Sequence, residues 1–267
     1  MTFPTTAEAR LADAEATAAK HTILTCVVGS HLYGTNVASS DRDEMSIAVG
    51  EPRHLIGYGS FDHYVSRPGG PNDPSRPGDV ERTTYSLRKY VSLAAGGNPN
   101  VLPVLFAPDE FVTVTHPVAD ELRRMRSRFV TARTLGAYLG FASQERERFR
   151  GERGQKNVNR RELVDRFGYD VKYAANIVRV AAQGCSLATD GELVLPLPEP
   201  TRSQVIAIRS GEVPLDEANR MVDSSIAALE RACHAPARRL PEFPDWDVLG
   251  GWVVDAHLAY WKDMGMI

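Results

Sequence analysis

Residues 22–49 constrain the fold of this chain more than any other part of the sequence. Thr22–Val28 is a short apolar run, rich in β-branched residues, that stops at Gly29, and such a run is typical of a buried strand. From Asp41 to Val49 the residues alternate, so that a strand here would carry Asp41 and Asp43 on one face. The segment therefore predicts two strands, with Gly29 at the end of the first.

The Gly29-Ser30 pair fits a phosphate-binding turn. Glycine lets the backbone approach a ligand closely, and a helical turn over His31–Tyr33 would aim its free N–H groups and the Ser30 hydroxyl at an anion. Gly-Ser turns are also common without any ligand, so an ordinary turn is the alternative.

Asp41 and Asp43 are candidate metal ligands. Two carboxylates side by side repel each other unless a cation lies between them, and hard oxygen ligands suit Mg²⁺ or Mn²⁺. A third carboxylate is expected from Glu81, at the start of the Thr- and Tyr-rich run 81–86. Asp79 could replace Glu81, and a solvated loop or an exposed glutamate at a strand start is the non-functional reading of these acids.

Together these segments resemble the polymerase β-like nucleotidyltransferase superfamily, and the longer match is to its predicted RNA-repair branch. The blocks that carry the resemblance are Gly29–Gly34, Ser40–Asp43, Tyr85–Tyr90, Gly97–Asn100, Gly168–Lys172, Ile208–Glu212 and Leu240–Asp245. The resemblance implies a metal-dependent enzyme that moves NMP from an NTP to a hydroxyl acceptor, with an RNA 3′ end such as that of tRNA as the expected acceptor.

The resemblance also implies roles for individual residues. Gly29 and Ser30 would hold the NTP phosphates, and Asp41, Asp43 and Glu81 would bind two Mg²⁺ (or Mn²⁺) ions. Lys172 and Arg179 share a helix face and would meet the triphosphate or the acceptor, although ordinary surface cations look the same in sequence. The chain departs from the family at Tyr173 and Asn176, where histidines are expected, and at Pro103, where a glutamate is expected.

The sequence predicts an α+β fold in two parts. Residues 1–115 would form a catalytic domain, a small mixed sheet flanked by helices, and residues 116–267 a helical domain. The helices expected in the second part are 118–128, 131–150, 160–183, 202–210, 215–233 and 246–262. Asn98-Pro99 is predicted to start a helix, and the Pro/Gly-rich stretch 66–78 to form a loop beside the site.

Composition limits the remaining possibilities. A net charge of −3 argues against a surface that binds nucleic acid everywhere, although the arginine-rich stretch 123–166 could be a local track. A solvated helix surface with Glu–Arg pairs is the favoured reading of that stretch. The three cysteines have no metal-type spacing and no long apolar run occurs, so a cytoplasmic protein without membrane contact is expected.

Two other functions remain open from sequence. A non-catalytic nucleotide-sensing or partner-binding module of a defence or toxin–antitoxin system could keep the same fold. A phosphodiesterase or nuclease could use the same metals, but the Gly29-Ser30 pair favours triphosphate binding. The sequence decides neither the NTP, nor the acceptor, nor the oligomeric state.

Overall fold

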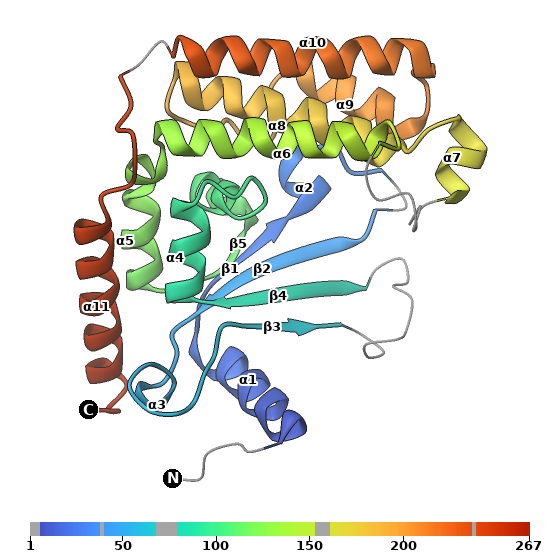
Figure 1. Ribbon diagram of the computed structural model, residues 1–267. Coiled ribbons are helices and arrows are strands. Elements are labelled where there is room, and N and C mark those ends of the chain that lie inside the picture. The colour runs from blue at the N-terminus through green and yellow to red at the C-terminus, as the bar shows by residue number, and fades with distance from the viewer. Residues whose placement is uncertain (1–5, 38–39, 68–78, 153–160, 237–238) are drawn as a thin grey trace.

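A five-stranded mixed sheet forms the centre of the N-terminal half, with the strand order β3-β4-β2-β1-β5 (Figure 1). The structure is a computed structural model that describes residues 6–37, 40–67, 79–152, 161–236 and 239–267. The strands are β1 (Thr22–Val28), β2 (Arg42–Ala48), β3 (His63–Ser66), β4 (Val80–Ser86) and β5 (Val112–Thr115). The strands predicted at 22–28, 41–49 and 81–86 are confirmed as β1, β2 and β4.

The register of the sheet brings acidic residues of separate segments together. Strands β1 and β2 are antiparallel with Val28 opposite Asp43, whereas β2 and β4 are parallel with Asp43 opposite Glu81. Neighbouring strands lie about 4.8 Å apart, so residues opposite each other must interact. The pairing alone therefore places two acids from different strands side by side.

Helices cover both faces of the sheet. One face carries the main core, in which Leu24, Met45 and Ile47 are buried with residues of α4 (Leu87–Ala95). Against the other face lies α1 (Ala7–His21), where Ala18 packs with Ala48 and Phe61. Two short elements, α2 (Gly29–Tyr33) and α3 (Pro52–Leu55), extend from the strand ends.

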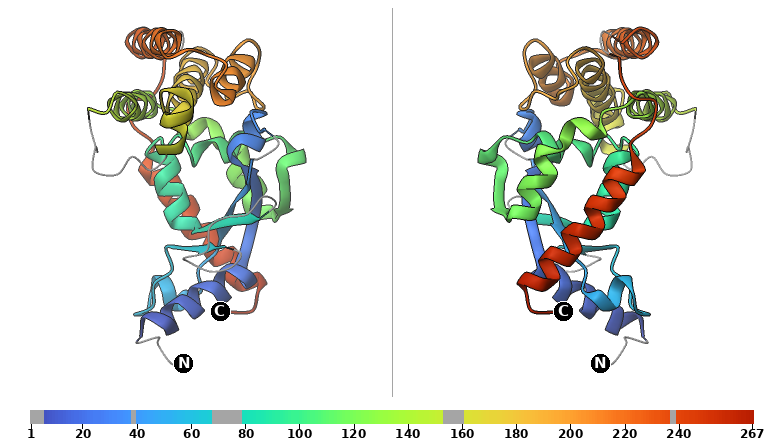
Figure 2. Two further views of the ribbon diagram at one scale, coloured as in Figure 1. Left: turned by 90° about the vertical axis from the view of Figure 1, so that its right-hand side faces the viewer. Right: turned by 90° about the vertical axis from the view of Figure 1, so that its left-hand side faces the viewer.

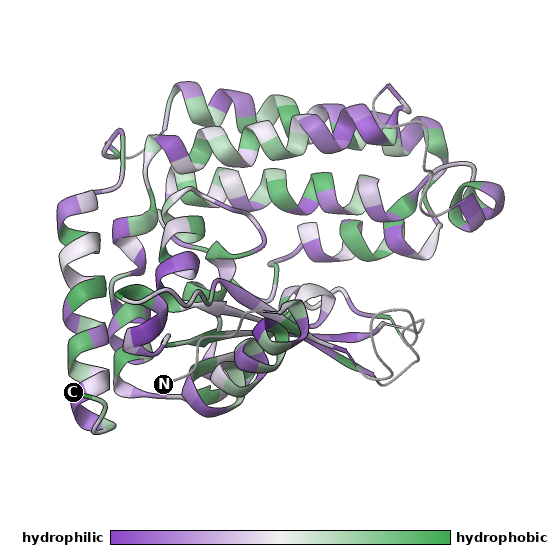
Figure 3. Ribbon diagram, turned by 60° about the horizontal axis from the view of Figure 1, so that its bottom comes forward, coloured by the Kyte–Doolittle hydropathy of each residue, from purple (hydrophilic) through white to green (hydrophobic). Residues whose placement is uncertain are grey.

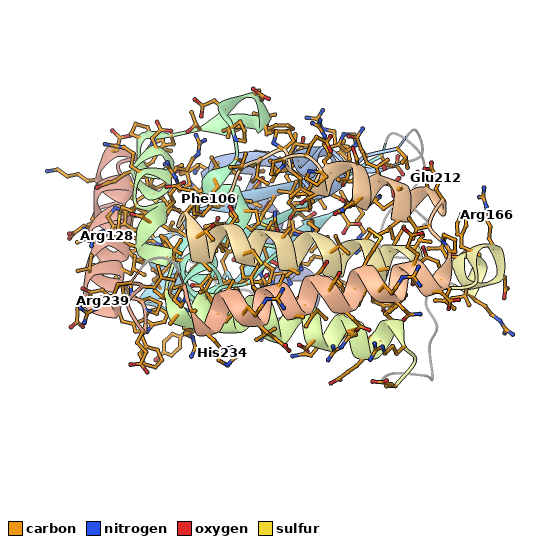
Figure 4. All side chains as sticks on the ribbon, turned by 90° about the horizontal axis from the view of Figure 1, so that it is seen from above. Phe106, Arg128, Arg166, Glu212, His234 and Arg239 are labelled. Carbon is orange, nitrogen blue, oxygen red and sulfur yellow. The ribbon has the colours of Figure 1, made fainter. Side chains whose placement is uncertain are left out.

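A layer of long helices lies over the end of the sheet at which β1 stops (Figure 1). Its members are α6 (Ala132–Phe149), α7 (Arg161–Phe167), α8 (Val171–Thr189), α9 (Thr201–Ser210) and α10 (Leu215–His234). Seen from above, Arg166 and Glu212 lie at the α7 end of this layer and His234 and Arg239 at the opposite end (Figure 4). The α+β fold class, with a mixed sheet followed by helices, is confirmed.

The remaining helices stand beside the sheet. They are η1 (Leu102–Phe106), η2 (Asp109–Phe111), α5 (Pro117–Arg124), η3 (Arg126–Phe129) and α11 (Trp246–Asp263). Helix α11 returns to the first half of the chain: the Trp261 indole N–H donates to the Gly50 carbonyl at 2.8 Å, and a 3.3 Å hydrogen bond joins His21 Nδ1 and the Tyr260 hydroxyl. The division into domains 1–115 and 116–267 stays a prediction.

Three predicted helices differ from the structure. The helix expected over 118–128 ends at Arg124 as α5 and is followed by the 3₁₀ helix η3. The single helix expected over 160–183 is two, α7 and α8, because Gly168 adopts φ +80° and Asp170 then caps a new helix by accepting from the N–H groups of Lys172 and Tyr173. The helix expected from Asn98-Pro99 does not begin there. Instead the Asn98 side chain accepts from the Asn100 N–H at 2.9 Å, and a 3₁₀ helix begins at Leu102.

The arginine-rich stretch is divided among several elements in the described residues. Its side chains are spread over α5, η3, α6 and α7, and several are paired with acids; the pairs are Arg123–Asp109, Arg126–Glu192, Arg146–Asp223, Arg148–Glu145 and Arg150–Asp223. These pairs agree with the solvated-surface interpretation, and the nucleic-acid track stays an untested alternative. Residues 68–78 of the predicted loop and 153–160 of the arginine-rich stretch lie outside the described residues.

Within the described ranges, no helix is both long enough and apolar enough to cross a membrane.

The cap of α8 gives a test of this architecture. Asp170→Ala leaves the first N–H groups of α8 without their acceptor, so we expect a loss of about 1 kcal/mol in the free energy of unfolding, measured by urea denaturation. Asp170→Asn, which keeps an acceptor oxygen, is the control and should lose much less. Equal stability of Asp170→Ala and the wild type would contradict the assigned helix start.

Candidate active site

A pocket of about 730 Å³ opens between the end of the sheet and the helical layer. All seven residues singled out from the sequence line it: Gly29, Ser30, Asp41, Asp43, Glu81, Lys172 and Arg179. The acids come from β2, its preceding residue and β4, whereas the two cations come from α8. Segments separated by more than a hundred residues thus form opposite walls of one pocket.

Gly29 is required by the space that Asp43 occupies. Its φ is +64°, which favours glycine, and a Cβ at this position would lie 2.8 Å from Asp43 Oδ2. Helix α2 begins at Gly29 and ends at Gly34, which has φ +66° and donates its N–H to the His31 carbonyl. The glycine therefore allows the chain to turn while the Asp43 carboxylate remains directly against it.

Asp43 lies in an unfavourable electrostatic position. Its side chain can still be reached by solvent through the pocket, yet the surrounding protein desolvates the carboxylate, and Glu81 and Asp41 add negative charge beside it. These effects raise the pKa of Asp43, while His31 and Lys172 oppose them. The three carboxylates thus form a concentrated negative charge with only partial compensation from the protein.

Glu81 is held by an arginine from the neighbouring strand end. The Arg67 Nε atom lies 2.9 Å from Glu81 Oε2, and Arg67 Nη2 donates to Oε1 at 3.1 Å. Both side chains remain partly exposed, which limits the energy of the pair. Arg67 therefore neutralises one member of the acidic cluster without burying it.

The residue types of the acidic cluster suit a divalent metal ion, although their side chains are not arranged around a common point. Among the described residues, no three His, Cys, Asp or Glu side chains are arranged ready to hold a metal ion. The pKa of Asp43 is raised first by desolvation and then by the two carboxylates around it, Glu81 and Asp41, and a bound cation would relieve that repulsion. Oxygen-only donors of this kind suit Mg²⁺ or Mn²⁺.

Lys172 supplies an exposed cation to the other wall of the pocket. It is the second residue of α8, and its charge lowers the pKa of Asp43. In the described part of the chain its ammonium group forms no ion pair. A solvated ammonium group without a fixed partner can move to meet an anion entering the pocket.

Arg179 is a buried cation held by neutral groups. Its guanidinium donates to the side-chain oxygens of Asn176 at 2.6 Å and Gln183 at 2.7 Å, and to Asn100 at 3.3 Å. Its Cζ atom lies 4.3 Å from the centre of the Tyr33 ring. No carboxylate pairs with it in the described ranges, so its charge remains available to the pocket while its position is fixed.

The sequence reasoning missed the network around Arg179. Asn176 also donates to Glu145 at 3.3 Å, and Glu145 accepts from Arg148 at 2.6 Å, so α6 and α8 are joined beside the pocket. The spacing of Asn176, Arg179 and Gln183 on one helix face was a usable signal. The contacts with Asn100 and Tyr33 had no such signal, because they depend on packing between distant segments.

Comparison with protein-family models decides the family. A model described as "RNA repair pathway DNA polymerase beta family", RlaP, matches residues 4–253. The chain belongs to the RlaP family. The resemblance inferred from the Gly29-Ser30 and Asp41-x-Asp43 segments is thereby confirmed, and RlaP membership places the chain among polymerase β-like nucleotidyltransferases linked to an RNA repair pathway.

A curated relative and a solved structure are also similar. An uncharacterised 38.9 kDa protein from the nrdC–mobD intergenic region of Enterobacteria phage T4 is 28% identical over 145 residues, which cover 54% of this chain and 43% of the phage protein. The chain thus spans less than half of that relative. A nucleotidyltransferase-like protein from Exiguobacterium sibiricum 255-15 is 10% identical, with 90% of this chain and 74% of that chain covered and a TM-score of 0.30.

The electrostatics of Asp43 predict a pH-dependent change in stability. Because its pKa is raised in the folded state, ionised Asp43 destabilises the fold above the ordinary aspartate pKa, and this cost disappears below it. We therefore expect metal-free Asp43→Asn to melt at a higher temperature than the wild type at neutral pH. The gap should close as pH falls below about 4. A lower melting temperature at neutral pH would contradict this assignment.

The Arg67–Glu81 pair predicts competition with metal. Arg67→Ala removes the cation that occupies Glu81, so we expect Mn²⁺ affinity, measured by titration calorimetry, to rise on the order of fivefold, as for an exposed pair worth up to about 1 kcal/mol. Arg88→Ala, which breaks the exposed pair with Asp62, is the matched control and should leave affinity unchanged. Weaker Mn²⁺ binding in Arg67→Ala would exclude competition.

Proposed function

We propose that this RlaP member is a metal-dependent nucleotidyltransferase that moves NMP from an NTP to a hydroxyl acceptor. The observation that carries the proposal is the division of charge in the pocket, with Asp41, Asp43 and Glu81 on the sheet side and Lys172 and Arg179 on α8. Such a pocket offers a place for cations and a place for phosphate anions next to each other. A triphosphate bound through divalent ions requires both.

Each residue has a distinct part in the proposed reaction. The Gly29 and Ser30 backbone, with the Ser30 hydroxyl, lies against the terminal phosphates. Lys172 moves onto the phosphate oxygens, and buried Arg179 stays fixed and orients them through its guanidinium fork. Glu81 accepts the proton of the attacking hydroxyl after Arg67 has moved away.

Asp41, Asp43 and Glu81 would hold the divalent ions, two Mg²⁺ or Mn²⁺. When bound, these ions lower the pKa of the attacking hydroxyl and neutralise the leaving pyrophosphate. The role of the protein is to fix the NTP so that the acceptor attacks the α-phosphorus in line, and to stabilise the charge that develops.

An RNA 3′ end, with tRNA as one instance, is the proposed acceptor. The support is the family's link to an RNA repair pathway. A protein or small-molecule hydroxyl would be compatible with the same catalytic groups. A cytoplasmic location agrees with an RNA acceptor and stays a prediction.

A non-catalytic nucleotide-sensing or partner-binding module is the second candidate. Arg67 favours it, because an arginine that occupies Glu81 leaves the acidic cluster without its third free carboxylate. Tyr173 and Asn176, which stand where the family is expected to have histidines, favour it as well. Such a module would bind an NTP without transferring any part of it.

Label transfer tests the proposal. The protein is incubated with each α-labelled NTP, Mg²⁺ or Mn²⁺, and RNA with free 3′ hydroxyls, and we expect labelled RNA. Asp43→Asn and Glu81→Gln should each reduce transfer by at least about a hundredfold, because each removes charge needed at the reacting centre. Asp79→Asn, which alters the other candidate acid, just before β4, should keep activity, as should the surface control Asp62→Asn.

The kinetics of Lys172→Ala distinguish an effect on NTP binding from an effect on the chemical step. This substitution should raise the KM for the NTP more than it lowers kcat, and Lys20→Ala, an exposed lysine on α1, should change neither. Full activity in Asp43→Asn would end the site assignment. NTP binding by the wild type without transfer to any acceptor would favour the sensing module.

A further inference from the structure

Exposed large hydrophobic residues concentrate at the C-terminal end of the described chain. Of the fourteen such residues in the described ranges, seven lie between 243 and 267. They are Phe243, Trp246, Val248, Val254, Leu258, Met264 and Ile267. Single exposed hydrophobic residues are normal on a protein surface, but a concentration on one element marks an interaction surface.

Helix α11 carries four of these residues, and three of them, Val248, Val254 and Leu258, lie on its outer side. In the right-hand view of Figure 2 this helix faces the viewer along its length, and Figure 3 shows hydrophobic residues recurring along it. Its inner side is buried through Leu249, Ala256 and Tyr260. The outer side is therefore a helix face with no covering element in the described structure.

A regular stripe runs along this outer face. The residues are spaced as i, i+4, i+7, i+11 and i+15, which keeps them on one side of an α-helix. In order they are Asp247, Gly251, Val254, Leu258 and Lys262. Val254 is 56% exposed and Leu258 46% exposed. The space above Gly251 is open, with no heavy atom within 4 Å of where a Cβ would lie.

The stripe is complementary to itself when reversed. Asp247 at its N-terminal end corresponds to Lys262 at its C-terminal end, and the open space at Gly251 corresponds to Leu258. Val254 lies near the middle. Asp247 and Lys262 form no ion pair within the described ranges. A two-fold axis between Val254 and Asp255 would bring each of these features onto its counterpart, with the exposed Asp255 side chains of the two copies beside each other at the edge of the stripe.

We propose that α11 pairs antiparallel with α11 of a second copy of this chain to form a two-fold symmetric dimer. Leu258 of each copy fills the open space above Gly251 of the other, and the two Val254 side chains meet at the axis. Asp247 of each copy pairs with Lys262 of the other. One surface thus supplies both halves of the interface, as an isologous contact requires.

Exposed hydrophobic residues at the two ends of α11 would add to the contact between the two copies. Phe243, which precedes α11, meets Met264 and Ile267, which follow its end, in the reversed copy. Aromatic residues of this kind are enriched at interfaces because they bury a large area. The helix is about 27 Å long, so the interface is modest and the association reversible.

The dimer surface is independent of the pocket. In Figure 1, α11 stands at the edge of the molecule opposite to α7, whose residues help to line the pocket. Dimerisation therefore leaves both pockets open, and its test does not depend on the enzymatic proposal.

Sedimentation equilibrium over a concentration series tests the dimer. We expect the wild type to pass from monomer to dimer, and Leu258→Glu to raise the dissociation constant at least about a hundredfold, since both copies lose the central contact. Leu11→Glu is the matched control, an exposed leucine on α1 at 59% exposure, and should dimerise as the wild type does. Circular dichroism confirms that each variant is folded.

Charge reversal tests the orientation of the helices. Asp247→Lys and Lys262→Asp should each weaken the dimer by placing like charges opposite each other, and the double variant should restore it towards the wild-type constant. A wild type that remains monomeric at every concentration overturns the proposal. Leu258→Glu that dimerises normally overturns it too, and a double variant no tighter than the single ones overturns the antiparallel arrangement.

Discussion

The repulsion between Asp43 and Glu81 is the constraint on which the rest of the site depends. Parallel pairing of β2 and β4 sets these two acids opposite each other, and Asp41 adds a third negative charge beside them. A folded chain that keeps such a cluster gives up stability, since the raised pKa of Asp43 reports a carboxylate that is costly to ionise. Structures accept such costs at functional sites, where a ligand supplies the missing compensation.

Three cations around the pocket offset this negative charge, each in a different way. Arg67 pairs with Glu81 directly and is partly exposed, so a competing cation can replace it. Lys172 acts through its field and stays free to move, whereas Arg179 is buried and fixed between neutral side chains of α8 and the Asn98–Asn100 turn. Because Arg179 also stacks on Tyr33 of α2, it joins the helical layer to the element that begins at Gly29. Arg179 is therefore one of the contacts that tie the two walls of the pocket together.

Local patterns were sufficient for β1, β2 and β4 and for the acids, whereas β3 and β5 were not predicted. The alternation in residues 41–49 predicted that Asp41 and Asp43 share a face, and β-branched content predicted β1 and β4. Patterns failed where a single backbone angle or a short polar contact decides the outcome. Gly168 ends α7 in a stretch with continuous helical periodicity, and Asn98 closes a turn rather than capping a helix. Both depend on competition between local structures of nearly equal energy.

The sequence by itself determined the types of most elements, the family and five of the charged residues that line the pocket, because spacing along a strand or helix fixes which side chains share a face. Only the tertiary structure decided that Glu81 lies directly opposite Asp43, that Arg67 occupies Glu81 and that Asn100 and Tyr33 hold Arg179. These contacts join residues that are far apart in the chain. They are set by strand register and helix packing, which follow from the burial of the whole core rather than from any local pattern.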